Sequence, residues 1–291
     1  MEHLDSTIQS HTIQLSDQNF NLHYLETGYD HPQEEVILLV HGWPTSSYLY
    51  RHMMAPLAKH RRVIAIDLPG FGKSDKNPTD SFSFGYHANI IQQFIEKLNI
   101  NKVHLVVHDL GGPIALWWAQ QHREQIASYV ILDTIIYPDF SWAVKLFVLM
   151  TVFPLIRTWF SSPSGIAFAM KLGIFNKSKL NKSTLTGYQA PFVNTANDRN
   201  ARKSLLRSAH RLHIKGFKDI AAGMKDIKQP TCLIYAENDI ILPEVSETMK
   251  RVADAIPHAK THCIPSCGHF LQEEKPEAVV KIMSDFYSKT T

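Results

Sequence analysis

The amino-acid sequence predicts an α/β fold with a mostly parallel sheet, and two observations support this prediction. Continuous apolar runs lie at residues 36–40, 63–66, 103–107, 129–132 and 232–235. Runs without polar alternation are typical of strands that are buried on both faces, as in parallel sheets. Longer segments with helical spacing separate these runs, which is the alternation of α/β proteins. The 291 residues are enough to bury one large core.

The remaining elements follow in chain order. Residues 7–13 and 21–25 predict an antiparallel opening pair of strands. The predicted core helices cover residues 48–59, 84–98, 112–121 and 277–287. The second of these carries apolar residues at the spacing of one helix face, and Pro276 is suited to the first turn of the last helix.

The alternation of strands and helices stops after Asp133. Residues 134–215 contain no run typical of a buried strand, but they contain two tryptophans, four prolines and many aliphatic residues. A run typical of a buried strand appears again at residues 230–235. We therefore predict a core made of residues 1–133 and 216–291, with residues 134–215 as a mainly helical cap over the sheet.

Composition and charge exclude several classes of partner. The 30 Lys and Arg against 27 Asp and Glu give a net charge of +3, so no basic footprint for nucleic acid is present. Three cysteines form no disulfide framework and favour a reducing compartment. Because the first residues also lack the apolar region of a secretory signal, we expect a cytoplasmic protein. Composition leaves the oligomeric state open.

One apolar run tests for membrane contact. Residues 146–156 are apolar or neutral and lie between Lys145 and Arg157, whereas a bilayer span needs about 20 such residues. We therefore expect no integral span, and predict that this run is a buried or partly exposed amphipathic segment. Contact with a membrane surface or an apolar substrate is the alternative.

A candidate nucleophile lies where the strand of residues 103–107 gives way to a helix. The segment Val107-His108-Asp109-Leu110-Gly111-Gly112 has the strand–turn–helix context of a nucleophile elbow, usually G-x-S-x-G, with Asp109 in the middle. The glycines let the helix turn back tightly. The helix N-terminus favours an ionised carboxylate. Asp109 as an ordinary helix N-cap is the structural alternative.

Two further turns complete the predicted chemistry. The turn of residues 41–44 follows the first buried strand, so the backbone N–H groups of Trp43 and Leu110 are the predicted oxyanion donors. Asp239 follows the strand of residues 232–235, and His269 lies near the C-terminus. The chain order nucleophile, acid, base matches that of α/β hydrolases, which predicts that Asp239 orients His269 as general base.

Metal and cofactor chemistry have weaker support. Cys263, Cys267 and His269 lie close in sequence but lack a second ligand pair with zinc spacing. No G-x-G-x-x-G follows the first buried strand, which disfavours a nicotinamide or flavin site. We expect no metal and no cofactor.

These motifs resemble the branch of the α/β hydrolases that uses an aspartate nucleophile, most closely the haloalkane dehalogenases and next the epoxide hydrolases. The matching stretches are HGWPTSSYLYRHM (41–53), DLPGFGKSDK (67–76), VVHDLGGPIAL (106–116), YQAPF (188–192) and GHFLQEEKPEAV (268–279). The resemblance implies an α/β-hydrolase fold with an eight-stranded, mostly parallel sheet, a helical cap and an acid at Asp239. It also implies a small apolar substrate.

The residues that would bind the leaving group differ from those that are usual in the two families. Dehalogenases usually place a halide-binding Trp after the nucleophile, where this chain has Leu110. A second halide donor falls near Asn176 in one subgroup, and in another it is an Asn at the position of Trp43. Epoxide hydrolases use two cap tyrosines. Tyr137 and Tyr188 match those positions poorly, and the second expected tyrosine falls within residues 205–209, which contain none.

Several functions therefore remain open. Carbon–halogen cleavage ranks first, with Trp43, Asn176 and Tyr188 as candidate pocket residues, and epoxide opening ranks second. Ester or lactone hydrolysis follows, because an oxyanion turn suits a carbonyl. Alternatives from other classes are a non-catalytic ligand-binding protein on a hydrolase scaffold and a protein that binds a membrane surface.

Overall fold

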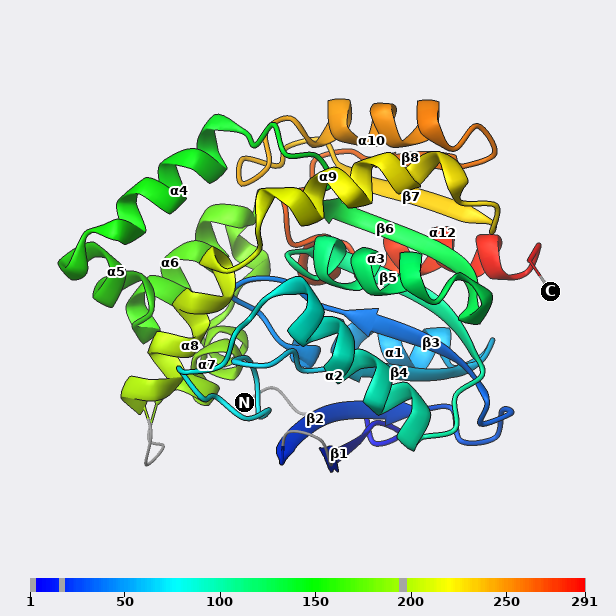
Figure 1. Ribbon diagram of the computed structural model, residues 1–291, viewed down its shortest axis with the longest axis horizontal. Coiled ribbons are helices and arrows are strands. Elements are labelled where there is room, and N and C mark those ends of the chain that lie inside the picture. Colours follow the sequence, from blue (N-terminus) through cyan, green and yellow to red (C-terminus); the bar gives the residue numbers. More distant parts are fainter. Residues whose placement is uncertain (1–3, 16–18, 194–197, 291) are drawn as a thin grey trace.

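A computed structural model describes residues 4–15, 19–193 and 198–290 of the chain. These residues contain one eight-stranded sheet with the order β1-β2-β4-β3-β5-β6-β7-β8 (Figure 1). Strand β2 pairs antiparallel with β1 and β4, and the other neighbours pair parallel. The predicted fold class, mostly parallel sheet and antiparallel opening pair are confirmed.

The sheet's eight strands include five, β3 to β7, that occupy the positions of the predicted apolar runs. The eight strands are β1 (Gln9–Leu15), β2 (Phe20–Thr27), β3 (Glu35–Val40), β4 (Arg62–Ile66), β5 (Lys102–Asp109), β6 (Ile126–Thr134), β7 (Thr231–Ala236) and β8 (Lys260–Ile264). Every apolar side chain in the central strands β3 to β6 is buried, except that of Ala127, which is partly exposed. Burial on both faces explains why these strands appear in the sequence as unbroken apolar runs.

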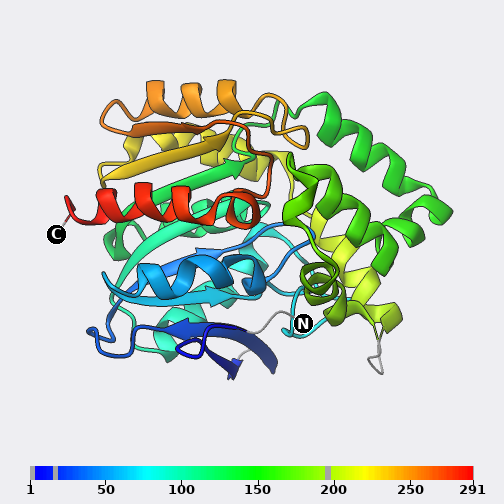
Figure 2. The ribbon, with the colours of Figure 1, turned by 180° about the vertical axis from the view of Figure 1, so that it is seen from behind.

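Helices cover both faces of the sheet. The core helices are α1 (Arg51–Leu57), α2 (Phe84–Lys97), α3 (Gly111–Gln121), α9 (Ile214–Gly223), α10 (Val245–Ala255), α11 (Leu271–Glu274) and α12 (Pro276–Tyr287). Helices α2, α3 and α9 lie side by side on one face (Figure 1), and α1 and α12 lie together on the other (Figure 2). Short 3₁₀ helices span Ser47–Tyr50, Arg123–Gln125, Lys177–Lys179, Ala190–Phe192 and Met224–Asp226.

Two of the predicted helices show how local sequence sets the boundaries. Helix α2 begins where the Ser83 hydroxyl accepts a hydrogen bond from Tyr86 N–H, because an N-cap side chain satisfies an otherwise unpaired amide. The predicted helix over residues 48–59 is instead split. A 3₁₀ turn capped by Ser46 precedes α1, which ends at Leu57.

The predicted cap contains five α-helices and, among its described residues, no strand after β6 ends at Thr134. They are α4 (Trp142–Val152), α5 (Pro154–Phe160), α6 (Pro163–Gly173), α7 (Lys182–Gln189) and α8 (Asp198–His210). Figures 1 and 2 place them together at one end of the molecule. We propose that this block is a cap domain. Helix α9 starts at Ile214, close to the predicted boundary at residue 216, and packs against α3.

The parallel strands point their carboxyl ends toward the cap (Figure 1). Strand β5 ends at Asp109 and β6 ends at Thr134, while Asp239 and His269 follow β7 and β8. Loops at the carboxyl edge of an open α/β sheet are where such folds bind ligands. The fold therefore gathers residues that are up to 160 positions apart, from Asp109 to His269, under the cap.

Candidate active site

The turn at Asp109 is held by close backbone packing. Asp109 has φ 49°, in the left-handed region that few non-glycine residues adopt. The Thr134 hydroxyl donates a hydrogen bond of 2.6 Å to the Asp109 carbonyl. A side chain at Gly111 would collide with the backbone carbonyls of Val40 and His41. The segment is therefore a sharp strand–turn–helix that presents Asp109, and not an ordinary helix N-cap, since Leu110 precedes α3.

The Asp109 carboxylate receives backbone hydrogen bonds from the predicted oxyanion turn. Trp43 N–H donates to Asp109 Oδ1 at 2.6 Å, and a side chain at Gly42 would fill the same space. Burial disfavours the ionised carboxylate. The neighbouring His269, whose Nε2 lies 3.5 Å from Asp109 Oδ2, and the Leu110 N–H nevertheless hold the Asp109 pKa below its ordinary value. The carboxyl group is therefore ionised at neutral pH.

His269 lies between the two predicted carboxylates. Its Nδ1 donates to Asp239 Oδ2 at 2.7 Å, and its Nε2 lies 3.5 Å from Asp109 Oδ2. The imidazole is fully buried, and Nε2 has no hydrogen-bond partner among the described residues. Burial alone would lower the His269 pKa, but the charges of Asp239 and Asp109 raise it well above the ordinary value. The structure thus brings together all three residues that the chain order predicts.

Asp239 is fixed by its own loop. Its Oδ1 accepts hydrogen bonds of 2.8 Å from Ile241 N–H and Leu242 N–H. Burial would raise the pKa of this carboxyl, but the charge and hydrogen bond of His269 and the two amides lower it. Asp239 is therefore an anion with a defined orientation, which suits a residue that holds an imidazole in one tautomer.

A third acidic residue, Asp133, lies beside Asp239 and His269 and was not predicted from the sequence. It is buried at the end of β6, and its carboxyl oxygens accept from Ala236 N–H at 3.0 and 3.3 Å. Burial first, and then the charge of Asp239, raise the Asp133 pKa well above its ordinary value. A protonated Asp133 can donate to Asp239. Its position at the end of a buried strand was the available signal, because Asp109 and Asp239 also follow such strands.

Asp133, Asp239 and His269 form the only group among the described residues with a geometry that could hold a metal ion. One ligand atom each from Asp133, Asp239 and His269 lies within 4.8 Å of the others. Backbone amides and the His269 Nδ1–H already fill the acceptor positions of Asp239. This donor set fits a shared proton better than a cation, since a cation would displace those hydrogen bonds. Cys263 and Cys267 lie outside the group.

His108 also supports the site and was not predicted. It is buried next to Asp109 in the strand, and its Nε2 donates to the His269 carbonyl at 2.9 Å. Burial lowers the His108 pKa to about 3. The ring is therefore neutral, and it holds the loop that carries His269. No pattern separates it from the other 15 histidines.

A cavity of ≈ 640 Å³ opens onto Asp109 and Leu110. Its wall is mostly apolar and combines core and cap residues: Trp43, Pro44, Ile135, Trp142, Ala143, Val144, Leu146, Phe147, Val148, Met150, Phe160, Phe168, Ala169, Leu172, Ala209, Asp239, Ile240, Ile241, Leu242, Pro243 and Phe270. The Trp43 indole N–H donates to the Leu205 carbonyl at 3.1 Å. That donor is already used, so Trp43 offers the cavity its ring and not a free side-chain hydrogen bond.

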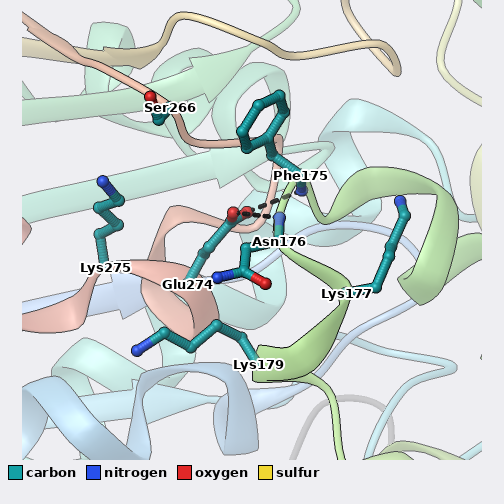
Figure 3. Close-up of a pocket in the computed structure, with 7 residues that line it drawn as sticks. All are labelled: Phe175, Asn176, Lys177, Lys179, Ser266, Glu274 and Lys275. Carbon is teal, nitrogen blue, oxygen red and sulfur yellow. Dashed lines mark hydrogen bonds between the residues drawn. The ribbon is translucent and has the colours of Figure 1, made fainter.

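Asn176 lies outside this cavity, contrary to the prediction that it is a pocket residue. It is exposed, and its backbone N–H donates to Glu274 Oε1 while its side-chain oxygen accepts from Ser178 (Figure 3). It lines a separate hollow of ≈ 400 Å³ with lysines 177, 179 and 275. The reason is local: Asn176 caps the short helix after α6, which keeps its amide at the surface.

Tyr188 is also absent from the cavity wall. Its hydroxyl donates to Glu273, which in turn accepts a two-point hydrogen bond from the buried Arg51. The residue therefore fastens α7 to the core and is not positioned as a pocket donor. Tyr137 lies elsewhere, under the Arg251 guanidinium at 3.6 Å from the ring centre. Neither tyrosine faces the Asp109 cavity.

Comparison with known proteins agrees with this architecture. A family model described as alpha/beta hydrolase fold matches residues 35–276. A haloalkane dehalogenase from Psychrobacter cryohalolentis is 27% identical over 93% of this chain and 88% of its own length. A cis-3-alkyl-4-alkyloxetan-2-one decarboxylase from Shewanella oneidensis is 29% identical over 95% of this chain and 88% of its own length.

Solved structures show the same fold. Haloalkane dehalogenase DbeA from Bradyrhizobium elkani superposes with a TM-score of 0.82 at 24% identity, covering 97% of this chain and 98% of its own. Epoxide hydrolase CorEH superposes with a TM-score of 0.78 at 20% identity, covering 98% of this chain and all of its own. Both families named by the sequence resemblance thus occur among the structural relatives.

Proposed function

The chain belongs to the alpha/beta hydrolase fold family, and we propose that it is a cofactor-independent hydrolase that forms a covalent ester on Asp109. The observation that carries the proposal is the Asp109 carboxylate at the floor of an apolar cavity, with His269 Nε2 at 3.5 Å. The largely apolar wall supports a small apolar substrate. Free Cys232, Cys263 and Cys267 support a cytoplasmic location.

In the first step, Asp109 attacks a saturated carbon of the substrate. The carboxylate needs no base, because it is ionised at neutral pH. The bond from that carbon to the leaving group breaks, and the leaving group departs with the bonding electron pair. A serine in the same place would produce an ether, which water cleaves poorly, whereas an aspartyl ester can be hydrolysed.

In the second step, His269 activates water against the ester carbonyl. Forming the ester removes the negative charge of Asp109, one of the charges that raise the His269 pKa. The imidazole then loses its proton more readily and can act as a general base. Trp43 N–H and Leu110 N–H hold the oxyanion, and Asp239 stabilises the imidazolium that forms.

Carbon–halogen cleavage is the first candidate reaction. It rests on the breadth of the resemblance and on the dehalogenase relatives. Asp109 provides the nucleophile that this reaction needs at the cavity. However, Leu110 has no side-chain donor for a departing halide, and the Trp43 indole N–H is already bonded to the Leu205 carbonyl. One hydrogen bond to a charged group contributes about 1.5–3 kcal/mol, so a halide leaving group would depart with less assistance than in a site with two indoles. Epoxide opening ranks next, with no cap tyrosine at the cavity.

Opening of a lactone is favoured by that same lack of halide donors. In a four-membered lactone, attack at the saturated ring carbon releases a carboxylate, a stable leaving group that stays attached to the substrate. Water could then hydrolyse the Asp109 ester to a hydroxy acid. Alternatively, loss of CO₂ from the attached carboxylate could expel Asp109 and leave an alkene, the reaction class named for the Shewanella relative.

A single-turnover experiment in H₂¹⁸O tests the proposed intermediate. If water attacks the Asp109 carbonyl, the first alcohol product carries ¹⁶O and the label enters the aspartate. Direct attack of water on the substrate would put ¹⁸O in the product and contradict the proposal.

The substrate panel should contain short bromoalkanes, styrene oxide and dialkyl β-lactones. The respective products are halide, diol, and hydroxy acid or alkene. Release of an alkene does not use water, so the isotope label cannot report on that reaction. Its test is whether Asp109→Asn loses alkene formation. A ligand that stabilises the protein against heat but is never converted would favour a binding protein.

A further inference from the structure

Helices α4 and α5 expose an unusual amount of apolar surface. We call the exposed side chains of α4, α5 and α6 the cap face, and its apolar members are Trp142, Leu146, Val148, Leu149, Val152, Phe153, Leu155, Trp159, Phe168 and Leu172. Leu149 is 58% exposed, Val152 64% and Leu155 87%.

The periodicity shows that this exposure belongs to whole helix faces. Within α4, Thr151 is the one buried residue, and the exposed apolar side chains are Trp142, Leu146, Val148, Leu149 and Val152, with Phe153 directly after the helix. They share one broad side of the helix, whose other side is also apolar and places Val144, Phe147 and Met150 in the cavity wall. A contiguous apolar surface of this kind marks an interaction site in a monomeric protein.

Cations are interleaved with the apolar residues. Lys145 and Arg157 lie within α4 and α5, and Lys171 precedes Leu172 at the end of α6. All three are exposed, and none has an acidic ion-pair partner among the residues that the structure describes. Residues 140–197 contain no Asp or Glu.

The charge of the whole chain is divided in the same way. Residues 134–215 contain 12 Lys and Arg and 2 Asp and Glu, a net charge of +10. The other residues contain 18 and 25, a net charge of −7, so the overall value of +3 hides two opposite regions. A basic, apolar face complements an anionic lipid surface, which attracts Lys and Arg and accepts apolar side chains between its headgroups.

The cap face is also continuous with the cavity above Asp109. Trp142, Leu146, Val148, Phe168 and Leu172 belong both to the exposed set and to the cavity wall. Both views place α4 and α5 at the outer end of the molecule, away from the body of the sheet (Figures 1 and 2). No single helix among the described residues is long and apolar enough to cross a membrane, and α4 and α5 meet at a bend of 113°.

From these observations we propose that the cap face docks on the surface of an anionic lipid bilayer. The exposed apolar side chains enter the headgroup region, and the neighbouring cations contact lipid phosphates. The cavity mouth then faces the membrane, so an apolar substrate dissolved in the bilayer reaches Asp109 without crossing water. This proposal concerns location and substrate delivery, and it stands whichever leaving group the enzyme uses.

Vesicle co-sedimentation of the full chain tests the proposal without any measurement of turnover. The probes are phosphatidylcholine vesicles with and without one quarter phosphatidylglycerol. We expect binding to the anionic vesicles, at least tenfold weaker binding to the neutral ones, and weakening by salt. Failure of the wild-type chain to sediment with the anionic vesicles would overturn the proposal.

Two double variants probe the two components of the cap face. Lys145→Gln with Arg157→Gln should weaken binding about 25-fold, at about fivefold for each cation. Leu149→Asn with Leu155→Asn should weaken it at least tenfold, because both side chains lose their apolar contact. The matched controls, Lys228→Gln with Lys281→Gln on the core and Ile214→Asn at 57% exposure, should bind like wild type.

Self-association is the competing occupant of this face. A dimer that dissociates in the Leu149 and Leu155 variant, without vesicle binding by the wild type, would replace the proposal with an interface between copies. Because a variant can also misfold, circular dichroism melting accompanies each one. Quenching of Trp142 and Trp159 fluorescence by spin-labelled lipid provides a readout in the wild-type chain, and absence of quenching would contradict the proposal.

Discussion

The core and the cap differ in the kinds of residue that they place around the cavity. In the core, Asp109, Asp239 and His269 are buried; backbone amides hold the two carboxylates, and Asp239 holds the imidazole. In the cap, α4 and α5 are exposed, basic and apolar, and they contribute wall residues to the cavity but no side chain to the proton chemistry. We therefore propose that the core carries the reaction, whereas the cap determines which molecules reach it and from which side.

The largest expected effect comes from removing the nucleophile in the core. Asp109→Asn should lower turnover by about 10⁴-fold or more, because the amide cannot form the ester intermediate. The cap face is unchanged, so vesicle binding should remain at the wild-type level. Steady-state rates and co-sedimentation on the same preparation measure both. Comparable turnover by Asp109→Asn would show that the chemistry lies elsewhere.

The two acids behind His269 should contribute unequally. Asp239→Asn should lower turnover by about 10²–10⁴-fold, because it removes the anion that stabilises the imidazolium. Asp133→Asn should cost only about tenfold, since an amide can still donate to Asp239. Equal losses in the two variants, compared by initial rates near neutral pH, would contradict this assignment of roles.

The pH profile sharpens the role of Asp133. Its pKa is raised, so the carboxyl is protonated below that pKa and becomes an anion as the pH rises through it. The added charge would hold His269 protonated and slow the base-catalysed step, which produces an alkaline decline in turnover. Asp133→Asn cannot ionise and should lose that decline. A profile of kcat against pH that has the same alkaline limb in both proteins would exclude Asp133 as its source.

Leu110 tests whether the cavity is adapted to halide. Leu110→Trp places an indole N–H next to the nucleophile, and one such hydrogen bond to a departing anion is expected to contribute about 10- to 150-fold. Bromoalkane turnover should increase accordingly, while lactone turnover should not. Leu110→Phe, of similar bulk without the donor, is the matched control. An equal change in both variants would indicate that only volume matters.

The smallest expected effect concerns the fastening of cap to core. Tyr188→Phe removes the hydroxyl that donates to Glu273, and a buried acceptor losing one donor costs about 1–3 kcal/mol of unfolding free energy. Arg51 still pairs with Glu273, so turnover should change less than threefold. Urea unfolding with parallel rate measurements checks both values. A large loss of turnover at unchanged stability would instead place Tyr188 in the catalytic machinery.

The meeting of Asp109, Asp239 and His269 was predictable because backbone geometry dictates their positions. A buried apolar run followed by Asp109 and two glycines leaves few structures other than a sharp turn, and the ends of parallel strands must meet at one edge. Asp133 was equally visible in principle, since it ends β6 in the same manner. It was missed because a carboxyl that holds a proton for another carboxyl has no motif of its own.

The cap residues were not predictable from spacing. Asn176 and Tyr188 were assigned to the pocket from the resemblance to two families, and the structure places Asn176 at the surface and Tyr188 in the Arg51–Glu273 network. The outward apolar face of α4 has the same composition as a buried helix. Only the arrangement of the helices distinguishes them, because nothing in a local pattern states which side is covered.

Trapping of the intermediate tests the central claim most directly. His269→Gln should still be alkylated at Asp109 but fail to activate water, so incubation with a substrate that the wild type hydrolyses should leave a stable adduct. Mass spectrometry of the peptide containing residues 102–123 should then show the mass of the alkyl group on Asp109. An unmodified peptide, from a folded variant that binds the substrate, would contradict a covalent aspartyl mechanism.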